Sequence, residues 1–139
     1  MTPETLAAVQ DRAYVHMRPW RARDFQAALA RPTTKLVTHR SSFLLAQVIP
    51  DDAEILTIFT DPDAQRQGQG RRLMQEFESQ MTRLKVTRLL LDVAAINTSA
   101  VAFYTALGFT QDGNRRQYYT LRDGKRSDAI LMSKTLTPE

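Results

Sequence analysis

The sequence predicts a mixed α/β protein built on one sheet, and three observations support this prediction. Apolar, β-rich runs bounded by turn residues recur between residues 35 and 60, at 88–93 and again near the C-terminus. Segments with helical apolar spacing lie among them. The 139 residues, 42% of them hydrophobic, suit one folded domain with a sizeable core. We therefore expect a single domain over residues 1–139, with a mixed, mostly antiparallel central sheet flanked by about four helices.

The N-terminal part is expected to hold two helices and three strands. Pro3 is expected at the first helical position, with Thr2 as the N-cap. The second, short helix carries Asp24 in its first turn and ends before Pro32. Turn residues then divide the next apolar stretch into strands at about residues 35–39, 43–49 and 54–60.

The C-terminal part alternates helices and strands. A third helix follows a glycine-rich turn, with an apolar stripe at i, i+4, i+8 and i+11 formed by Leu73, Phe77, Met81 and Leu84. A buried strand at 88–93 leads to a short helix at 100–107, capped by Asn97 and stopped by Gly108. Residues 109–121 and 127–136 form a terminal hairpin, where Asp123-Gly124 favours a type I′ turn.

Composition excludes several classes of function. Cysteine is absent, which removes disulfides, thiolate zinc sites and an acyl-cysteine intermediate. The two histidines stand in no metal-ligand spacing, so we expect no metal. No run reaches membrane-spanning length, and a soluble cytoplasmic protein is expected. The net charge of +4 comes from scattered arginines and fits an anionic cofactor or a solvated surface. Nucleic acid ranks last, because no recognition motif accompanies the charge.

The glycine-rich turn between residues 65 and 70 is the first candidate site. Gly68 and Gly70 stand between an apolar strand and a helix, where free backbone N–H groups and the helix dipole favour an anion. A plain tight turn is the alternative. The turn is not a Walker A loop, because no Gly-Lys-Ser/Thr follows, and Leu73 stands where a dinucleotide fingerprint needs its third glycine. Arg66 and Arg71 add positive charge suited to several phosphates.

The order of motifs adds specificity. The run Q-R-Q-G-Q-G at 65–70 resembles the Q/R-x-x-G-x-G/A signature of the GCN5-related N-acetyltransferases (GNAT). An acidic strand residue, a capping asparagine and a tyrosine before L-G-F follow it, as in the second motif of that family. The H-x-x-P-W segment at 16–20 and the tail R-R-x-Y-Y, D-G and D-A-I, at 115–130, are similar to the ribosomal-protein-alanine N-acetyltransferase group.

This resemblance implies a GNAT-like domain that uses acetyl-CoA. It assigns the cofactor to strand backbone, glycine loop and helix cap, at Ile58, Phe59, Thr60, Arg66, Gln67, Gly68, Gln69, Gly70, Arg71 and Asn97. It places Asp92 where the family has its base and Tyr104 where it has its general acid. Candidates for the acceptor side are Trp20, Glu54, Tyr118 and Tyr119.

The acceptor implied by the resemblance is the N-terminal α-amine of a protein or peptide, such as a ribosomal protein. Relatives generally have glutamate where Asp92 stands, so this base is one methylene shorter. Deprotonating an α-amine of pKa about 8 at neutral pH costs about 1.4 kcal/mol, against about 4.6 for a lysine. A weak base therefore suffices for an α-amine. Two alternatives remain open: an acetyltransferase for small amines, and a non-catalytic CoA-binding module. A monomer and a C2 dimer fit equally.

Overall fold

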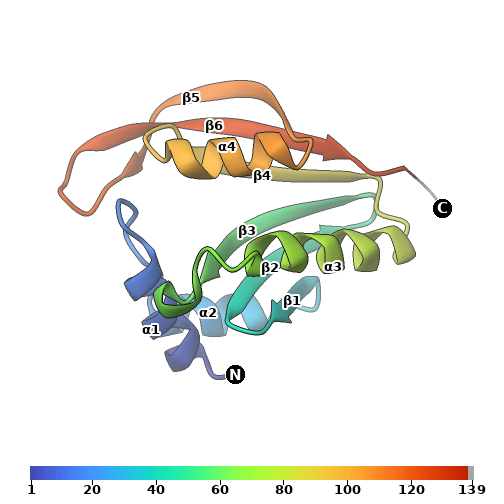
Figure 1. The fold of residues 1–139 in the computed structure, drawn as a ribbon, viewed down its shortest axis with the longest axis horizontal. Helices are drawn as coiled ribbons and strands as arrows, with labels where there is room; N and C mark the ends of the chain where they lie inside the picture. The colour runs from blue at the N-terminus through green and yellow to red at the C-terminus, as the bar shows by residue number, and fades with distance from the viewer. Residues whose placement is uncertain (138–139) are drawn as a thin grey trace.

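A single six-stranded sheet, in the order β1-β2-β3-β4-β6-β5, runs through the computed structural model, which describes residues 1–137 (Figure 1). The strands are β1 (Thr34–His39), β2 (Ser42–Ile49), β3 (Asp52–Thr60), β4 (Arg88–Ala94), β5 (Thr110–Thr120) and β6 (Arg126–Thr135). All neighbours are antiparallel except β3 and β4, which are parallel. The predicted mixed, mostly antiparallel sheet is confirmed.

Four α-helices cover the sheet: α1 (Pro3–Ala13), α2 (Ala22–Leu29), α3 (Gln69–Arg83) and α4 (Thr98–Ala106), and a 3-10 turn (Pro62–Ala64) precedes α3. In Figure 1, α3 lies over β1–β3 and α4 lies over the β4–β6 half of the sheet. The predicted caps hold α1 and α4: Thr5 N–H donates to Thr2 Oγ1 (3.1 Å), and Ala100 N–H donates to Asn97 Oδ1 (3.3 Å). Local sequence therefore fixes where these two helices begin.

The two faces of the sheet carry separate cores. On the face of α3 and α4, fully buried Met74 and Phe77 belong to one cluster with β2, β4 and β6. On the opposite face, Leu6 of α1 and Phe25 of α2 pack against Phe59 of β3. Both faces of the β1–β3 part of the sheet are thus covered, one by α3 and the other by α1 and α2.

A bulge in β3 changes which face its side chains meet. Leu45 of β2 pairs with Thr57, whereas the next residue pairs with Ile55, so Leu56 is an extra residue in β3. Before the bulge, Ile55 packs on the α3 side; after it, Phe59 packs on the α1–α2 side. One inserted residue reverses the alternation, because side chains alternate faces along a strand.

Two local predictions are wrong. Leu84 lies beyond the last residue of α3 and is 49% exposed, and Met74 takes a place in the core instead. The β5–β6 turn is not type I′, because Gly124 (φ +84°) is its only residue at positive φ, whereas type I′ requires two. Leu121 and Lys125 pair across a three-residue loop, so the turn is a type I turn followed by a glycine bulge.

Candidate active site

A cavity of about 540 Å³ opens where β3 and β4 separate. The two strands pair only at residues 52–54 and 88–90, close to their starts. Beyond that point, residues 55–60 of β3 and 91–94 of β4 line opposite sides of the cavity. The edge of β3 that faces the cavity has left its parallel partner, so its backbone groups are available to another extended chain.

Most of the predicted site residues meet at this cavity. It is lined from β3, the helix start of α3, β4, α4 and β5 by Ile58, Phe59, Thr60, Gly70, Asp92, Asn97, Tyr104 and Tyr119. The loop between α1 and α2 supplies a further wall, which includes the predicted Trp20. Residues predicted from separate motifs, up to a hundred positions apart in the chain, thus share one space.

A second hollow of about 340 Å³ lies at the start of α3. It is lined by the predicted loop residues Arg66, Gly68, Gln69, Gly70 and Arg71 together with Thr60, Ala64, Gln65 and Phe103. Thr60, Gln65, Gly70 and Phe103 line both hollows, so the two adjoin. The N-cap of α3, Gly68, has φ +73° and no side chain to cap the helix. The first-turn N–H groups are therefore open to an anion.

Gly70 is where α3, α4 and β3 approach closely. A Cβ at this position would lie 3.6 Å from the Phe103 ring and 4.0 Å from Thr60 Oγ1. A larger side chain would fill the passage between the two hollows. A Cβ would make ordinary van der Waals contacts here, so the position admits a small residue but not a large one.

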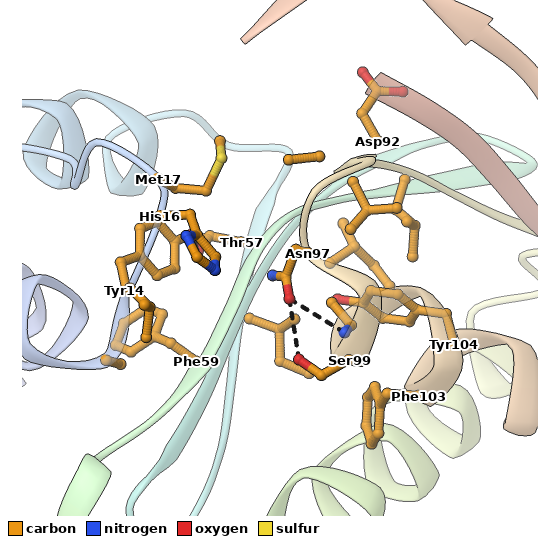
Figure 2. A pocket seen from close by; sticks show the side chains of 18 of the residues that line it. Tyr14, His16, Met17, Thr57, Phe59, Asp92, Asn97, Ser99, Phe103 and Tyr104 are labelled. Atoms are coloured by element: carbon orange, nitrogen blue, oxygen red, sulfur yellow. Dashed lines mark hydrogen bonds between the residues drawn. The ribbon is translucent and has the colours of Figure 1, made fainter. Parts of the chain in front are cut away.

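Asn97 uses one end of its amide for the fold and leaves the other free. Its Oδ1 accepts from Ala100 N–H at 3.3 Å and from Ser99 Oγ at 3.1 Å (Figure 2). Its Nδ2 forms no hydrogen bond with another described residue, and the side chain lines the cavity. The residue can cap α4 and still donate to a bound molecule.

Tyr104 is buried in α4, with 6% of its surface exposed. Its ring packs edge-on against Phe103 and Phe109, with centroids 5.4 and 5.5 Å away. Figure 2 shows the side chain reaching from α4 toward the cavity. Burial, reinforced by nearby Tyr14 and Tyr119, raises the pKa of the Tyr104 phenol, so its proton is retained at neutral pH.

Asp92 of β4 also lines the cavity, but its side chain points to another side of it than Asn97 and Tyr104 do. Its carboxylate is exposed and points away from Asn97 and Tyr104 (Figure 2). It lies close enough to Tyr119 to act on that phenol: burial first, and then the Asp92 charge, raises the pKa of Tyr119. The predicted acid and the predicted base therefore reach the cavity from separate sides.

Sequence reasoning missed a polar network on the α1 side. Gln10 is fully buried; its Nε2 donates to Thr57 Oγ1 (3.0 Å) and its Oε1 accepts from Trp20 N–H (2.6 Å). Tyr14 Oη lies 2.6 Å from Thr57 Oγ1, and burial raises the pKa of this phenol. The available signal was a glutamine one helical turn after the buried Leu6, within an apolar stripe.

Three predicted residues lie elsewhere. Glu54 and Tyr118 are not among the described residues that line the cavity; Glu54 sits where β3 and β4 are still paired, and Tyr118 is 48% exposed. The assignment of Glu54 to the acceptor side stays a prediction from the sequence. Gln67 lines neither hollow; its Oε1 accepts from Gln69 Nε2 at 3.3 Å, which fixes the loop around Gly68.

Beside the cavity, residues 16–18 of the loop between α1 and α2 contact residues 121–122 of the β5–β6 turn; we call these two segments the strap. Met17 and Leu121 form an antiparallel bridge. Arg122 N–H donates to the His16 carbonyl (3.0 Å), and Arg18 Nε donates to the Leu121 carbonyl (3.2 Å). Figure 1 shows the loop after α1 rising toward the β5–β6 turn. The edge of the cavity near Trp20 is therefore bridged.

A sheet split between two parallel strands, with a glycine loop leading into the next helix, defines a protein that holds an extended, phosphate-bearing ligand. A sequence model described as the acetyltransferase (GNAT) family matches residues 7–109. This chain belongs to that family. None of the described helices is long and apolar enough to cross a membrane. No group of three or more metal-binding side chains occurs within residues 1–137.

Known relatives agree with this assignment. The chain is 42% identical over 93 residues to a ribosomal protein bS18-alanine N-acetyltransferase of Escherichia coli K12. This aligned stretch covers 67% of this chain and 62% of that protein. It is 33% identical over 136 residues to the corresponding enzyme of Salmonella typhimurium, covering 95% and 91%. The crystal structure of the E. coli enzyme superposes with a TM-score of 0.87 at 32% identity, covering 99% and 89%. An Arabidopsis thaliana protein crystallised with acetyl-CoA shares the fold (TM-score 0.81, 16% identity, 96% and 93% covered).

Proposed function

We propose that this protein is an N-acetyltransferase that transfers the acetyl group of acetyl-CoA to the N-terminal α-amine of a protein. The observation that carries the proposal is the continuous path from the Gly68 hollow, along the free edge of β3, to the Tyr104 phenol. An extended thioester cofactor with a pyrophosphate at one end fits such a path. The similarity to bS18-alanine N-acetyltransferases supports the choice of acceptor.

The cofactor would use three features of the path. Its pyrophosphate would take the first-turn N–H groups of α3, with Arg66 and Arg71 supplying positive charge. Its pantetheine amides would pair with the backbone of residues 58–60, which no longer pair with β4. The free Nδ2 of Asn97 would donate to it from the opposite wall.

The reaction would proceed by direct attack, without an acyl-enzyme. The amine nitrogen attacks the thioester carbonyl, and a backbone N–H near Phe59–Thr60 stabilises the oxyanion. As the C–S bond breaks, Tyr104 donates its proton to the leaving sulfur. The proton lost by the amine passes to Asp92, through water because this carboxylate points away from Tyr104. Starting from the neutral amine, one proton leaves the nitrogen and one reaches the thiol; Asp92 then releases its proton to water and Tyr104 regains one from water, so the reaction is balanced.

The α-amine is favoured over a lysine by energy as well as by similarity. Asp92 is an exposed carboxylate, and removing a proton from an α-amine costs about 3 kcal/mol less than from a lysine side chain. The strap at residues 16–18 and 121–122 also favours an acceptor that enters by its end. A ribosomal protein would supply such an end, and we propose that the enzyme acts in the cytoplasm, where ribosomes assemble.

The strap supports a second candidate, acetylation of a small amine, because a bridged cavity suits a compact acceptor. A competition assay separates the two. The protein, acetyl-CoA, an alanine-initiated peptide and a pool of polyamines and amino acids are incubated together, and products are identified by mass spectrometry. An acetyl group on the peptide α-amine supports the proposal, and the same peptide with a blocked N-terminus and a free lysine is the matched control. Acetylation of small amines alone favours the second candidate. Acetyl-CoA binding without any product refutes both.

A further inference from the structure

The β5–β6 hairpin contains a distortion directly beside the cavity. Arg115 pairs with Ala129, and Tyr119 pairs with Ser127. Residues 116–118 of β5 therefore face a single residue of β6, Asp128. Within this bulge Gln117 has φ +49°, a left-handed conformation that costs free energy in a residue with a Cβ. A distortion of this kind persists only where its surroundings hold it.

Two charged side chains of β6 hold the Gln117 peptide groups. The Asp128 Oδ1 accepts from Gln117 N–H at 2.8 Å. From the other side, Arg126 donates to the Gln117 carbonyl through Nε (3.0 Å) and Nη2 (2.7 Å), and its Nη1 donates to Thr120 Oγ1 (3.0 Å). Bonds with one ionised partner are stronger than neutral ones, so the bulge is fixed at both its N–H and its C=O.

Asp128 has all of its acceptor groups engaged. Its Oδ2 accepts from Asn114 Nδ2 at 3.2 Å, and its backbone carbonyl accepts from Ala95 N–H at 2.8 Å. The Gln117 N–H, followed by the Asn114 amide, lowers the pKa of the Asp128 carboxyl, so it is ionised at neutral pH. The residue thus joins the bulge of β5 to the loop that leads from β4 to Asn97.

The bulge determines where the tyrosine pair lies. Tyr118 stays outside, with Arg115 stacked over its ring at 5.1 Å, and Tyr119 turns into the cavity wall near Asp92. If the ladder continued regularly from Arg115 and Ala129, Asp128 would face residue 116 and Ser127 would face Gln117, so every later residue of β5, Tyr119 included, would lose its present partner. The side chain that reaches the cavity is therefore set by the bulge.

We propose that Asp128 is a positioning residue for the acceptor side of the site, acting by holding the Gln117 bulge so that Tyr119 lines the cavity beside Asp92. The proposal rests on the proposed acetyltransferase function. It assigns a role to the acidic residue of the D-A-I run, which makes no contact with the cavity itself.

The test exchanges the two partners of the carboxylate. Asn114→Asp alone brings two carboxylates together and should raise KM for the acceptor peptide about tenfold or more. Asp128→Asn together with Asn114→Asp restores one carboxylate and one amide: the amide oxygen still accepts from Gln117 N–H, and its NH₂ donates to the new carboxylate. This double variant should return KM to within about twofold of the wild type. Asp128→Ala should raise the peptide KM without changing the KM for acetyl-CoA.

A double variant and a control variant decide the proposal. Asp128→Ala in a Tyr119→Ala background should add little to the effect of the tyrosine change, because both act through one side chain. Asp112→Ala, which removes an exposed carboxylate of the neighbouring strand β5, is the matched control and should leave both KM values unchanged. Full additivity with Tyr119→Ala, or equal losses for peptide and cofactor, would overturn the positioning role. If the wild type acetylates no amine, the proposed function fails first, and peptide binding to the CoA-loaded protein by calorimetry still tests Asp128.

Discussion

Tyr104→Phe is the most direct test of the chemistry, because it removes one oxygen atom and leaves the packing intact. The ring contacts with Phe103 and Phe109 do not involve the hydroxyl, which forms no hydrogen bond with another described residue. We expect the free energy of unfolding to change by no more than about 0.5 kcal/mol. Tyr104→Ala, by contrast, would leave a cavity in the core and should cost about 3–5 kcal/mol.

The effect on catalysis should be large. Loss of a general acid lowers the rate about 10²- to 10⁴-fold, which corresponds to about 3–5.5 kcal/mol of transition-state stabilisation. The assay is single-turnover acetylation of the peptide at saturating acetyl-CoA, with release of the CoA thiol followed by a colorimetric thiol reagent. Cofactor affinity, measured by calorimetry, should stay within about twofold. A single-turnover rate equal to that of the wild type would show that the leaving sulfur takes its proton from another group.

The same variant has a signature at alkaline pH. The raised pKa of Tyr104 means that the folded state keeps a proton that the unfolded state loses above pH 10.0. The unfolded state then binds fewer protons, so the free energy of unfolding falls as pH rises, by about 1.4 kcal/mol per unit for each such tyrosine. Tyr104→Phe should make this fall less steep between pH 10 and 11 in denaturant titrations, and an unchanged slope would contradict the assigned burial of the phenol.

Two further variants test the glycine loop and an ion pair between α3 and β6. Gly68→Ala should weaken acetyl-CoA binding, measured by calorimetry, about tenfold. It should lower the free energy of unfolding by only about 1 kcal/mol, because a Cβ at φ +73° meets nothing within 4 Å and adds backbone strain alone. Gly113→Ala is the control, since this glycine also lies in open space but has no positive φ. Glu78→Gln should destabilise the protein by about 1–2 kcal/mol, because it breaks a half-buried ion pair with Lys134 at 2.9 Å. Asp52→Asn, at an exposed pair, should cost less than about 1 kcal/mol, and an equal loss in thermal unfolding would refute the distinction.

The parts of the fold that local chemistry decides could be predicted from the sequence. Thr2 and Asn97 cap their helices through their own side chains, and Gly108 adopts φ +95° at the end of α4. The type I′ prediction failed because Asp123-Gly124 also suits a type I turn with a glycine bulge, and the pairing of Leu121 with Lys125 decides between them. That pairing depends on the whole hairpin.

The polar network of the site could not be predicted, since it joins distant parts of the chain. Gln10 and Thr57 are 47 positions apart, and the sequence around neither residue indicates that the two are hydrogen-bonded. The glycine loop, by contrast, is a contiguous run, which is why it could be recognised at once. Contiguous motifs located the proposed cofactor side; the acceptor side depends on loops and strand ends that only the fold brings together.

The Leu56 bulge links the fold to the site most directly. Because of the bulge, Thr57 points to the α1 side of the sheet, where its Oγ1 accepts from Gln10 of α1. Phe59 likewise points into the α1–α2 core. Without the extra residue, Phe59 would face the α3 side and the aromatic cluster with Phe25 could not form. The stretch D-A-E-I-L-T-I-F-T contains no glycine or proline, so the sequence does not predict the bulge. Packing on two faces accounts for it: Ile55 belongs to the core on the α3 side and Phe59 to the core on the α1–α2 side. The same residues of β3, from 55 to 60, line the proposed active site, so the bulge lies in the stretch where the cores and the cavity meet.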